Sequence, residues 1–470
     1  MERNQQLTAL MREAGFLKAD GSVGLKVFAR AVGRHAGREF KHTYVRRWMD
    51  GMVPRDNGVR RAITQALAER LGRPVGLDEV GYGHTQNLPP DLGLAYSENM
   101  ANGLDAVARL WQADLDSAAV LLDAPANVGA WNDAALSWLV STRRDVTGGA
   151  GKRMVGPADI AGIRSITEMF DRLDGQHGGG HARRALIEFL RTDVAGLLHG
   201  SYSDQVGRDL FKEATQATLL GAWMSYDAGL HGLAQRYFIQ ALRLAQSTGE
   251  RLLGASVLDA MSHQATFLGK YREAANLARA ARMGTETAGS ASASAHFYAM
   301  EARALARLGD AAECDRALSA AVREFERRSA DDPADWFGYF NESEFAAELG
   351  HCNRDLGRAV HASTYASQSL GPTPSGYVRS DFFATMVLAD AYLDQGEAEQ
   401  ACKVALDALR IGEQLKSARC GAYVGEFRVR LSRIEDSSTV REFIEQASQT
   451  RLWAPRDART VPNRGERRRT

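Results

Sequence analysis

The sequence predicts an all-α protein, and two observations carry this prediction. Apolar residues recur with helical spacing in nearly every segment of the 470-residue chain, whereas alternating runs of Val, Ile and Thr are almost absent. In addition, Ala, Leu, Arg and Glu dominate the composition, and all four favour helices. We therefore expect helices throughout the chain and, at this length, more than one domain.

The bulk composition is typical of a soluble protein, with 44% apolar and 25% charged residues. No apolar run approaches the ~18–20 residues needed to cross a bilayer, and the N-terminal segment lacks the apolar stretch of a signal peptide. Cys314, Cys352, Cys402 and Cys420 are far apart in the sequence, which favours buried thiols over disulfides or zinc ligands. We expect a cytoplasmic protein that binds no membrane, metal or cofactor.

Composition divides the chain into segments. The formal net charge is +0, yet the first 73 residues carry an excess of about eight positive charges. A Gly- and Pro-containing stretch at 81–90 indicates a linker. We expect a helix-turn-helix domain at 1–83, a helical connecting region at 84–205, a repeat domain at 206–435, a C-terminal helix at 436–453 and a basic disordered tail at 454–470.

The basic head is expected to form five short helices, at about 5–14, 25–36, 43–50, 58–71 and 77–80. Thr43 is a good N-cap for the third of them. In that helix Val45, Trp48 and Met49 share the inward face, while polar and basic residues occupy the remainder. The third helix is therefore predicted to be buried on one side and basic on the other.

A helix of this kind suits the major groove of DNA. Arginine can make two hydrogen bonds to guanine, and the side chains of Thr and Tyr can contact phosphates or a thymine methyl. The preceding helix carries basic residues where the first helix of the motif crosses the DNA backbone. The candidate DNA-binding residues are Arg34, Lys41, Thr43, Tyr44, Arg46 and Arg47. Solvated surface is the alternative interpretation of Arg34.

Between about residues 209 and 434 the sequence repeats loosely, at intervals of about forty residues. In each unit one helix ends near a glycine and an Ala-rich second helix follows. The glycines are Gly229, Gly269, Gly309, Gly357 and Gly396. This pattern resembles the tetratricopeptide repeat, whose stacked helix pairs form a solenoid with a concave face. An irregular helical domain is the alternative.

Residues of the head carry a second resemblance. Phe28-Ala29, the run from Thr43 to Trp48, Gly51 and Pro54-Arg55 together resemble the lambda-repressor-like helix-turn-helix family, although the interval 33–42 between the second and third helices is longer than usual there. With the segment 71–77, the head is similar to an actinobacterial group in which this domain is fused to tetratricopeptide-like repeats. The resemblance implies a transcriptional regulator of differentiation or secondary metabolism. Paired recognition helices imply a homodimer on double-stranded DNA.

The concave face of such repeats is lined by the first helix of each pair and is a candidate site for a peptide or protein effector. An Asn amide, for example, can bond both the N–H and the C=O of a peptide backbone. The candidate effector-binding residues are Trp223, His263, Tyr298, Asn341 and Glu344. Further candidates for the lining are Gln216, Asp259, Glu301 and Asp381. Ordinary packing is the alternative for each of them.

Other chemistry is suggested but lacks its full pattern. The segment 147–153 resembles a phosphate-binding loop without its first Gly and its Ser or Thr. His177 and His181 have the spacing of metal ligands on a helix, but three glycines lie between them. These glycines indicate a turn that could hold an anion beside Arg183. No catalytic arrangement is identifiable, and we expect no enzyme. The rival to a regulator is a repeat scaffold with a nonspecific basic head.

Overall fold

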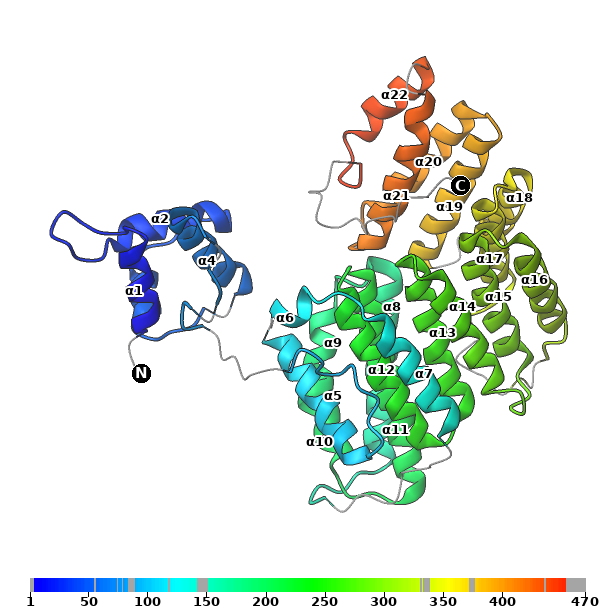
Figure 1. Cartoon of the computed structure of the whole chain (residues 1–470), viewed down its shortest axis with the longest axis horizontal. Helices are drawn as coiled ribbons and strands as arrows, with labels where there is room; N and C mark the ends of the chain where they lie inside the picture. Colours follow the sequence, from blue (N-terminus) through cyan, green and yellow to red (C-terminus); the bar gives the residue numbers. More distant parts are fainter. Residues whose placement is uncertain are drawn as a thin grey trace. The chain divides into compact units, whose positions relative to one another are not determined.

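The computed structural model describes residues 4–54, 56–73, 75–77, 79–82, 89–116, 119–141, 151–329, 332, 339–371, 377–434 and 437–453. Within them the secondary structure is helical, apart from two isolated β-bridges, so the predicted all-α fold is confirmed. The chain divides into two compact units, residues 1–90 and 91–470 (Figure 1). The tail expected at 454–470 and most of the linker expected at 81–90 lie outside the described residues.

The described part of unit 1 (residues 1–90) contains α1 (Gln5–Glu13), α2 (Leu25–Ala36), α3 (His42–Met49) and α4 (Asn57–Leu71). These bounds agree with the first four predicted helices to within one residue. The fifth predicted helix, at 77–80, is wrong in its described residues, which form a turn closed by a 3.0 Å hydrogen bond from Tyr82 N to Leu77 O. So short a segment between Gly76 and Gly81 does not offset the cost of helix nucleation.

One apolar core joins the helices of unit 1. Trp48 of α3 and Phe28 of α2 are fully buried in it. Asn4 ties the ends of the unit together, because its N–H donates to Met49 O at 2.8 Å and its side-chain amide to Val80 O at 2.8 Å. Its Oδ1 also accepts from Leu7 N at 2.9 Å and caps α1. The position of α3 is thus fixed both by burial and by hydrogen bonds to the start of the chain.

The turn between α2 and α3 is short because α2 continues to Ala36. Gly37 ends α2 in the left-handed region, at φ +65°. A Cβ at Gly33 would lie 2.8 Å from Arg38 O, so a glycine there lets the chain fold back across the end of α2. The interval 33–42 therefore contains the last turn of α2, and only residues 37–41 separate the two helices.

Unit 2 (residues 91–470) begins with the helices of the expected connecting region. They are α5 (Met100–Leu115), α6 (Ala119–Leu122), α7 (Val128–Val140), α8 (Pro157–His177), α9 (Arg183–Phe189), the π-helical η1 (Leu190–Val194) and α10 (Ala195–Leu198). Pro157 begins α8, as expected for a residue with a preset φ and no N–H to satisfy.

Paired helices make up the remainder of unit 2 and lie side by side in Figure 1. The first helices of the pairs are α11 (Asp204–Asp227), α13 (Arg251–Phe267), α15 (Ala291–Leu308), α17 (Glu342–Asp355), α19 (Val378–Asp394) and α21 (Ala418–Leu431). The second helices of the first five pairs are α12 (His231–Thr248), α14 (Tyr271–Met283), α16 (Ala311–Glu326), α18 (Ala359–Leu370) and α20 (Ala398–Gly412). After the 3₁₀ turn η3 (Ser432–Ile434), α22 (Ser438–Ala447) packs against α20. No described helix is both long and apolar enough to span a membrane.

A glycine with positive φ occupies the turn inside each of the first five pairs. Their φ angles lie between +73° and +86°, a region that disfavours residues with a side chain. They are the five glycines that the repeat pattern identified: Gly229, Gly269, Gly309, Gly357 and Gly396. The predicted helix–turn–helix units are therefore present, with their turns at the predicted positions.

The connecting helices pack on the repeats through buried polar contacts. Asp114 of α5 is almost fully buried, and its carboxylate accepts from Tyr237 Oη at 2.7 Å and from the Arg183 guanidinium at 3.0 Å. The Gln240 amide of α12 donates to Gly93 O at 2.9 Å. These contacts satisfy groups that would be costly to bury alone. Residues 91–205 thus belong to the same compact unit as the repeats.

Asp227 joins the beginning of the repeat array to its end. Its carboxylate, at the end of α11, accepts from Ser417 Oγ at 2.8 Å and from Gly179 N at 2.9 Å. Arg379 of α19 and Arg419 of α21 lie 3.5 and 3.8 Å from it. The first helix of the array is therefore linked to the turn after α8, to α19 and to the start of α21.

Trp138 fixes α7 to the repeats. Its ring is buried against Gly254 of α13 and Gly284 at the end of α14, and a Cβ at either glycine would overlap the ring. The Arg251 guanidinium lies 3.7 Å from the ring centroid and donates to Trp138 O at 2.9 Å. Two residues without side chains thus make room for the largest side chain at this contact.

We predict that Gly254→Ala lowers the free energy of unfolding of unit 2 by about 1–3 kcal/mol, because the added methyl must displace the Trp138 ring. Urea denaturation of the full chain measures the loss. Gly162→Ala is the matched control: Gly162 is an exposed residue of α8 whose Cβ would meet nothing within 4 Å. The control should leave stability unchanged or raise it by up to ~1 kcal/mol. Equal losses in the two variants would contradict the role of Trp138.

Candidate functional site

The exposed face of α3 brings most of the predicted DNA-binding residues together. Val45 and Trp48 are buried, at 0% and 1% exposure, and they anchor the opposite face of the helix. The exposed residues on α3 and at its start are Lys41, His42, Thr43, Tyr44, Arg46 and Arg47. A five-residue turn joins α2 and α3, and the second of these helices exposes one face to solvent.

The start of α3 differs from the prediction. Thr43 is not the N-cap, because the helix already begins at His42 and Lys41 occupies the cap position without a side-chain hydrogen bond. Thr43 therefore lies inside the first turn, where its hydroxyl faces solvent instead of the helix end. Tyr44 is 44% exposed, and its ring packs edge-on against Phe40 at 6.0 Å. Packing by Phe40 fixes the chain at the entry to the helix.

The basic side chains of unit 1 fall into two classes. Arg34 on α2 is exposed but pairs with Glu69 of α4 at 3.4 Å, and Arg38 pairs with Asp56 at 2.7 Å. Among the described residues, Arg46 and Arg47 have no acidic partner, and neither has Lys41. The exposed face of α3 therefore carries positive charge without an acidic partner, as Arg12 and Arg30 do elsewhere in unit 1, whereas Arg34 is partly neutralised.

Trp223 and His263 meet in the interior of the repeats. Their rings, from α11 and α13, are 5.4 Å apart, and the Tyr226 hydroxyl is hydrogen-bonded to His263 Nδ1 at 3.1 Å. Burial, together with the charges of Arg419 and Arg303, lowers the pKa of His263 well below its usual value. The imidazole is therefore neutral at physiological pH and acts as a hydrogen-bonding aromatic group.

Trp223 also lines a cavity with two further predicted residues, Gln216 and Asp259. The cavity encloses about 430 Å³ of space, part of it open to solvent. Asp259 faces His296 at 2.9 Å, and His296 Nε2 is 3.2 Å from the Tyr339 hydroxyl. The structure thus brings Gln216, Trp223 and Asp259 together on the inner face of α11 and α13.

Tyr298 and Glu301 lie away from this interior. Tyr298 follows His296 by two residues and so lies about 200° around α15 from it. Its ring packs under the Arg282 guanidinium of α14 at 4.7 Å. Glu301 accepts from Arg279, also of α14, at 2.6 Å. The structure therefore places both residues between α15 and α14, apart from the other candidates.

Asn341 and Glu344 are at the start of α17. The Asn341 side-chain oxygen caps the helix by accepting from Ser343 N and Glu344 N at 2.9 and 3.1 Å. Because that oxygen already accepts two hydrogen bonds from the helix, it is not free to accept one from the backbone of a peptide. Glu344 is half-buried, and burial raises the pKa of its carboxyl, which the hydrogen bond from Ser380 only partly offsets. Asp381 is half-buried in the first turn of α19.

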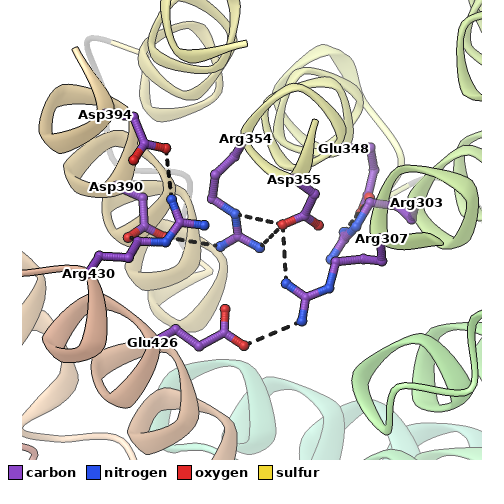
Figure 2. A network of polar contacts seen from close by, with 9 residues as sticks. All are labelled: Arg303, Arg307, Glu348, Arg354, Asp355, Asp390, Asp394, Glu426 and Arg430. Atoms are coloured by element: carbon purple, nitrogen blue, oxygen red, sulfur yellow. Dashed lines mark hydrogen bonds and ion pairs between the residues drawn. The ribbon is translucent and has the colours of Figure 1, made fainter. Parts of the chain in front are cut away.

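A ladder of charged side chains crosses four successive inner helices, and no individual motif in the sequence indicated it. Figure 2 shows these side chains pointing toward one another, with Asp355 between Arg354 and Arg307. The ladder consists of Arg303 and Arg307 of α15, Glu348, Arg354 and Asp355 of α17, Asp390 and Asp394 of α19, and Glu426 and Arg430 of α21. A usable signal was present: charged pairs such as Arg303 and Arg307 recur four residues apart on first helices of the pairs, the helices predicted to line the concave surface.

Two acids of the ladder are shifted in opposite directions. Burial alone would raise the pKa of Asp355, yet Arg354, Arg307 and Arg303 lower it below its usual value. Burial raises the pKa of Asp390 to about 6, because Arg354 and Arg430 offset only part of the desolvation. Asp355 is therefore held ionised by the arginines of α15 and α17, whereas desolvation favours protonation of Asp390 on α19.

The glycine turn after α8 is occupied by the protein's own carboxylates. Gly179 N donates to Asp227, and Arg183 pairs with Asp114. The alternative of an external anion beside Arg183 is therefore not supported. The rings of His177 and His181 are 4.8 Å apart, but the described residues contain no group of three potential metal ligands. The part of the loop at 147–150 lies outside the described residues.

Comparison with known protein families gives a match in unit 1. Residues 7–83 match the family model of the SP15 N-terminal domain. The match extends from α1 past α4 and so includes the whole candidate nucleic-acid surface. No curated protein matches the chain.

We predict that buried neutral histidines make unit 2 sensitive to acid. Burial, with a smaller contribution from Arg419, lowers the pKa of His231 to about 4. The folded protein thus resists protonation that the unfolded chain accepts near pH 6.5. Stability from this group is complete above that pH and is lost as pH falls toward 4, by about 1 kcal/mol per pH unit. His231→Gln, which does not titrate, should show a shallower fall in urea-unfolding free energy between pH 7 and 5.

The exposed His361 of α18 provides the control for this prediction. His361→Gln makes the same substitution at an exposed position and should reproduce the wild-type fall in urea-unfolding free energy. Identical slopes for His231→Gln and the wild type would show that His231 is accessible to protons in the folded chain.

Proposed function

We propose that the chain is a sequence-specific, DNA-binding transcriptional regulator whose repeat unit binds an effector. The observation that carries the proposal is the exposed face of α3, where Arg46 and Arg47 have no acidic partner among the described residues. The helix is anchored by a buried tryptophan and follows α2 through a five-residue turn. A rigid helix with outward guanidinium groups has the geometry for major-groove recognition.

The remaining exposed residues support the same mode of binding. Lys41 and Thr43 are at the start of α3, where phosphate contacts are made by recognition helices, and Arg46 and Arg47 are one turn further along. Arg34 can bind a phosphate of the DNA backbone only if its ion pair with Glu69 breaks. We propose a homodimer, because two such helices read the half-sites of an inverted repeat.

The repeat unit supplies the proposed sensing function. Its inner helices place aromatic, histidine and charged side chains around two cavities, a composition that suits a polar ligand such as a peptide. An effector that favours one conformation of the chain would shift the DNA-competent population, and one with equal affinity for both would have no effect. The resemblance to actinobacterial regulators of differentiation or secondary metabolism supports this division of roles and a cytoplasmic location.

We predict that the Arg46→Ala/Arg47→Ala double variant loses selective DNA binding. Each bidentate contact to guanine contributes about 1–3 kcal/mol of discrimination, so affinity for the selected site should fall by at least tenfold. A binding selection on genomic fragments at near-physiological salt, run with the full chain and the variant, measures the effect. The wild type should enrich a defined site, and the variant should not.

Two single variants serve as controls. Arg12→Ala removes an exposed arginine of α1 and should leave enrichment unchanged. Arg34→Ala should cost less than either α3 arginine, because Glu69 already compensates that charge. If DNA is recovered without selection, and binding falls steeply with salt, the rival scaffold with a nonspecific basic head is favoured instead.

A further inference from the structure

A second cavity of the repeat interior contains several buried polar atoms without partners. It lies between α13, α15, α17 and α21 and encloses about 490 Å³ of space, partly open to solvent. Thr266 Oγ1, Arg303 Nε and Asp355 Oδ2 belong to side chains that line it, and none of the three has a hydrogen-bond partner in the described part of the chain. The three side chains are more than nine-tenths buried.

Three unpartnered groups on one cavity call for a ligand, because buried polar atoms in native proteins are nearly always hydrogen-bonded. Other atoms of the same side chains do have hydrogen-bond partners within the protein. Asp355 Oδ1 accepts from Arg354 at 2.8 Å and from Arg307 at 3.2 Å, whereas Oδ2 of the same carboxylate accepts from no described residue. Arg303 likewise uses one terminal nitrogen on Glu348 and leaves its Nε–H unused.

The charges around the cavity are already balanced. Arg303, Arg307 and Arg354 are matched by Asp355, Glu426 and Glu348, each within ion-pair distance of one of them (Figure 2). An anionic ligand would be repelled by the acids and a cationic one by the arginines. The hydrogen-bonding groups without a partner are one donor, Arg303 Nε, one acceptor, Asp355 Oδ2, and the Thr266 hydroxyl. Together they match an uncharged ligand group that both donates and accepts hydrogen bonds.

From this geometry we infer that the cavity binds an uncharged amide group. The amide N–H donates to Asp355 Oδ2, and its carbonyl accepts from Arg303 Nε. The Thr266 hydroxyl forms a further hydrogen bond, either to the amide carbonyl or from the amide N–H. Phe267 and Tyr423, which also line the cavity, offer aromatic faces to the planar group. The amide belongs either to a peptide or to a small free molecule. This inference deepens the proposed effector role of the repeats and rests on it.

Thr266→Val separates ligand binding from folding. Because the Thr266 hydroxyl has no partner, its replacement by an isosteric methyl should leave the melting temperature of the free protein unchanged or raised. The variant should bind an amide about two- to tenfold more weakly, since one hydrogen bond is lost. Thr218→Val is the matched control: Thr218 is equally buried, but its hydroxyl bonds Ala214 O inside α11, and binding should not change.

The experiment uses the full chain and probes of known chemistry. Saturation-transfer NMR compares benzamide with benzoate and benzylammonium, and affinity selection with mass spectrometry screens mixed nonapeptides with blocked ends. We expect benzamide to bind and its two charged analogues to bind more weakly. Tighter capture of peptides, sensitive to Thr266→Val, would identify a peptide as the source of the amide, whereas binding of benzamide alone would identify a small free molecule.

Two results would overturn the inference. If no probe binds, the cavity holds ordered water only. If Thr266→Val binds as the wild type does, the probes occupy another surface. These measurements contain no DNA, so they test the cavity alone, and failure of the proposed regulatory function is detected separately by the α3 variants.

Discussion

Burial of arginine on the inner helices is the constraint on which most of unit 2 depends. A guanidinium stays ionised in proteins, so each buried one requires acidic partners close by. Arg354 finds them on two helices, in Asp355 and Asp390, and Arg379 finds Asp174 of α8 at 2.7 Å. The pairs that join two helices, Arg354–Asp390 and Arg379–Asp174, constrain how far one helix is displaced along the other. The register of the whole array is therefore determined by charge as well as by packing.

The ladder contributes more to specificity than to stability. The desolvation of buried ions offsets much of their attraction, so such pairs are weak evidence of net stabilisation. Most of the stability must come from the Ala-rich seams and the core side chains, which are close-packed. Fixed register has a further consequence, because a guanidinium has five donors in a rigid plane and rarely satisfies all of them. Arg303 Nε, one of the three unpartnered atoms of the cavity, is a donor of this kind.

In unit 1 the arginines lie on the surface and not in the interior. The core of this unit is apolar, and solvent at the surface removes the need for a partner. Arg34 and Arg38 nevertheless pair with acids, whereas Arg46 and Arg47 of α3 have no acidic partner among the described residues. The same residue type thus serves internal architecture in unit 2 and an outward-facing surface in unit 1. This contrast supports the proposal that unit 1 is the part of the chain that binds DNA.

The sequence by itself determined the features that depend on near neighbours in the chain. Helical periodicity predicted the all-α class and the bounds of α1 to α4, and the need for positive φ located the five repeat turns, Gly229 to Gly396. Periodicity also predicted correctly that Val45 and Trp48 are buried. The start of α3 was predicted less well, because Lys41 and not Thr43 occupies the N-cap position.

Only the tertiary structure decided which side chains meet. Arg303 pairs with Glu348 from the next repeat, and Ser417 bonds Asp227, 190 positions earlier in the chain. Tyr298 and Asn341 were reasonable candidates for the concave face, yet one packs against α14 and the other caps α17. The physical reason is that local preference fixes the phase of a helix only approximately, whereas contacts depend on the packing of several helices at once. The candidate cavity exists because four helices converge there, and no single segment encodes it.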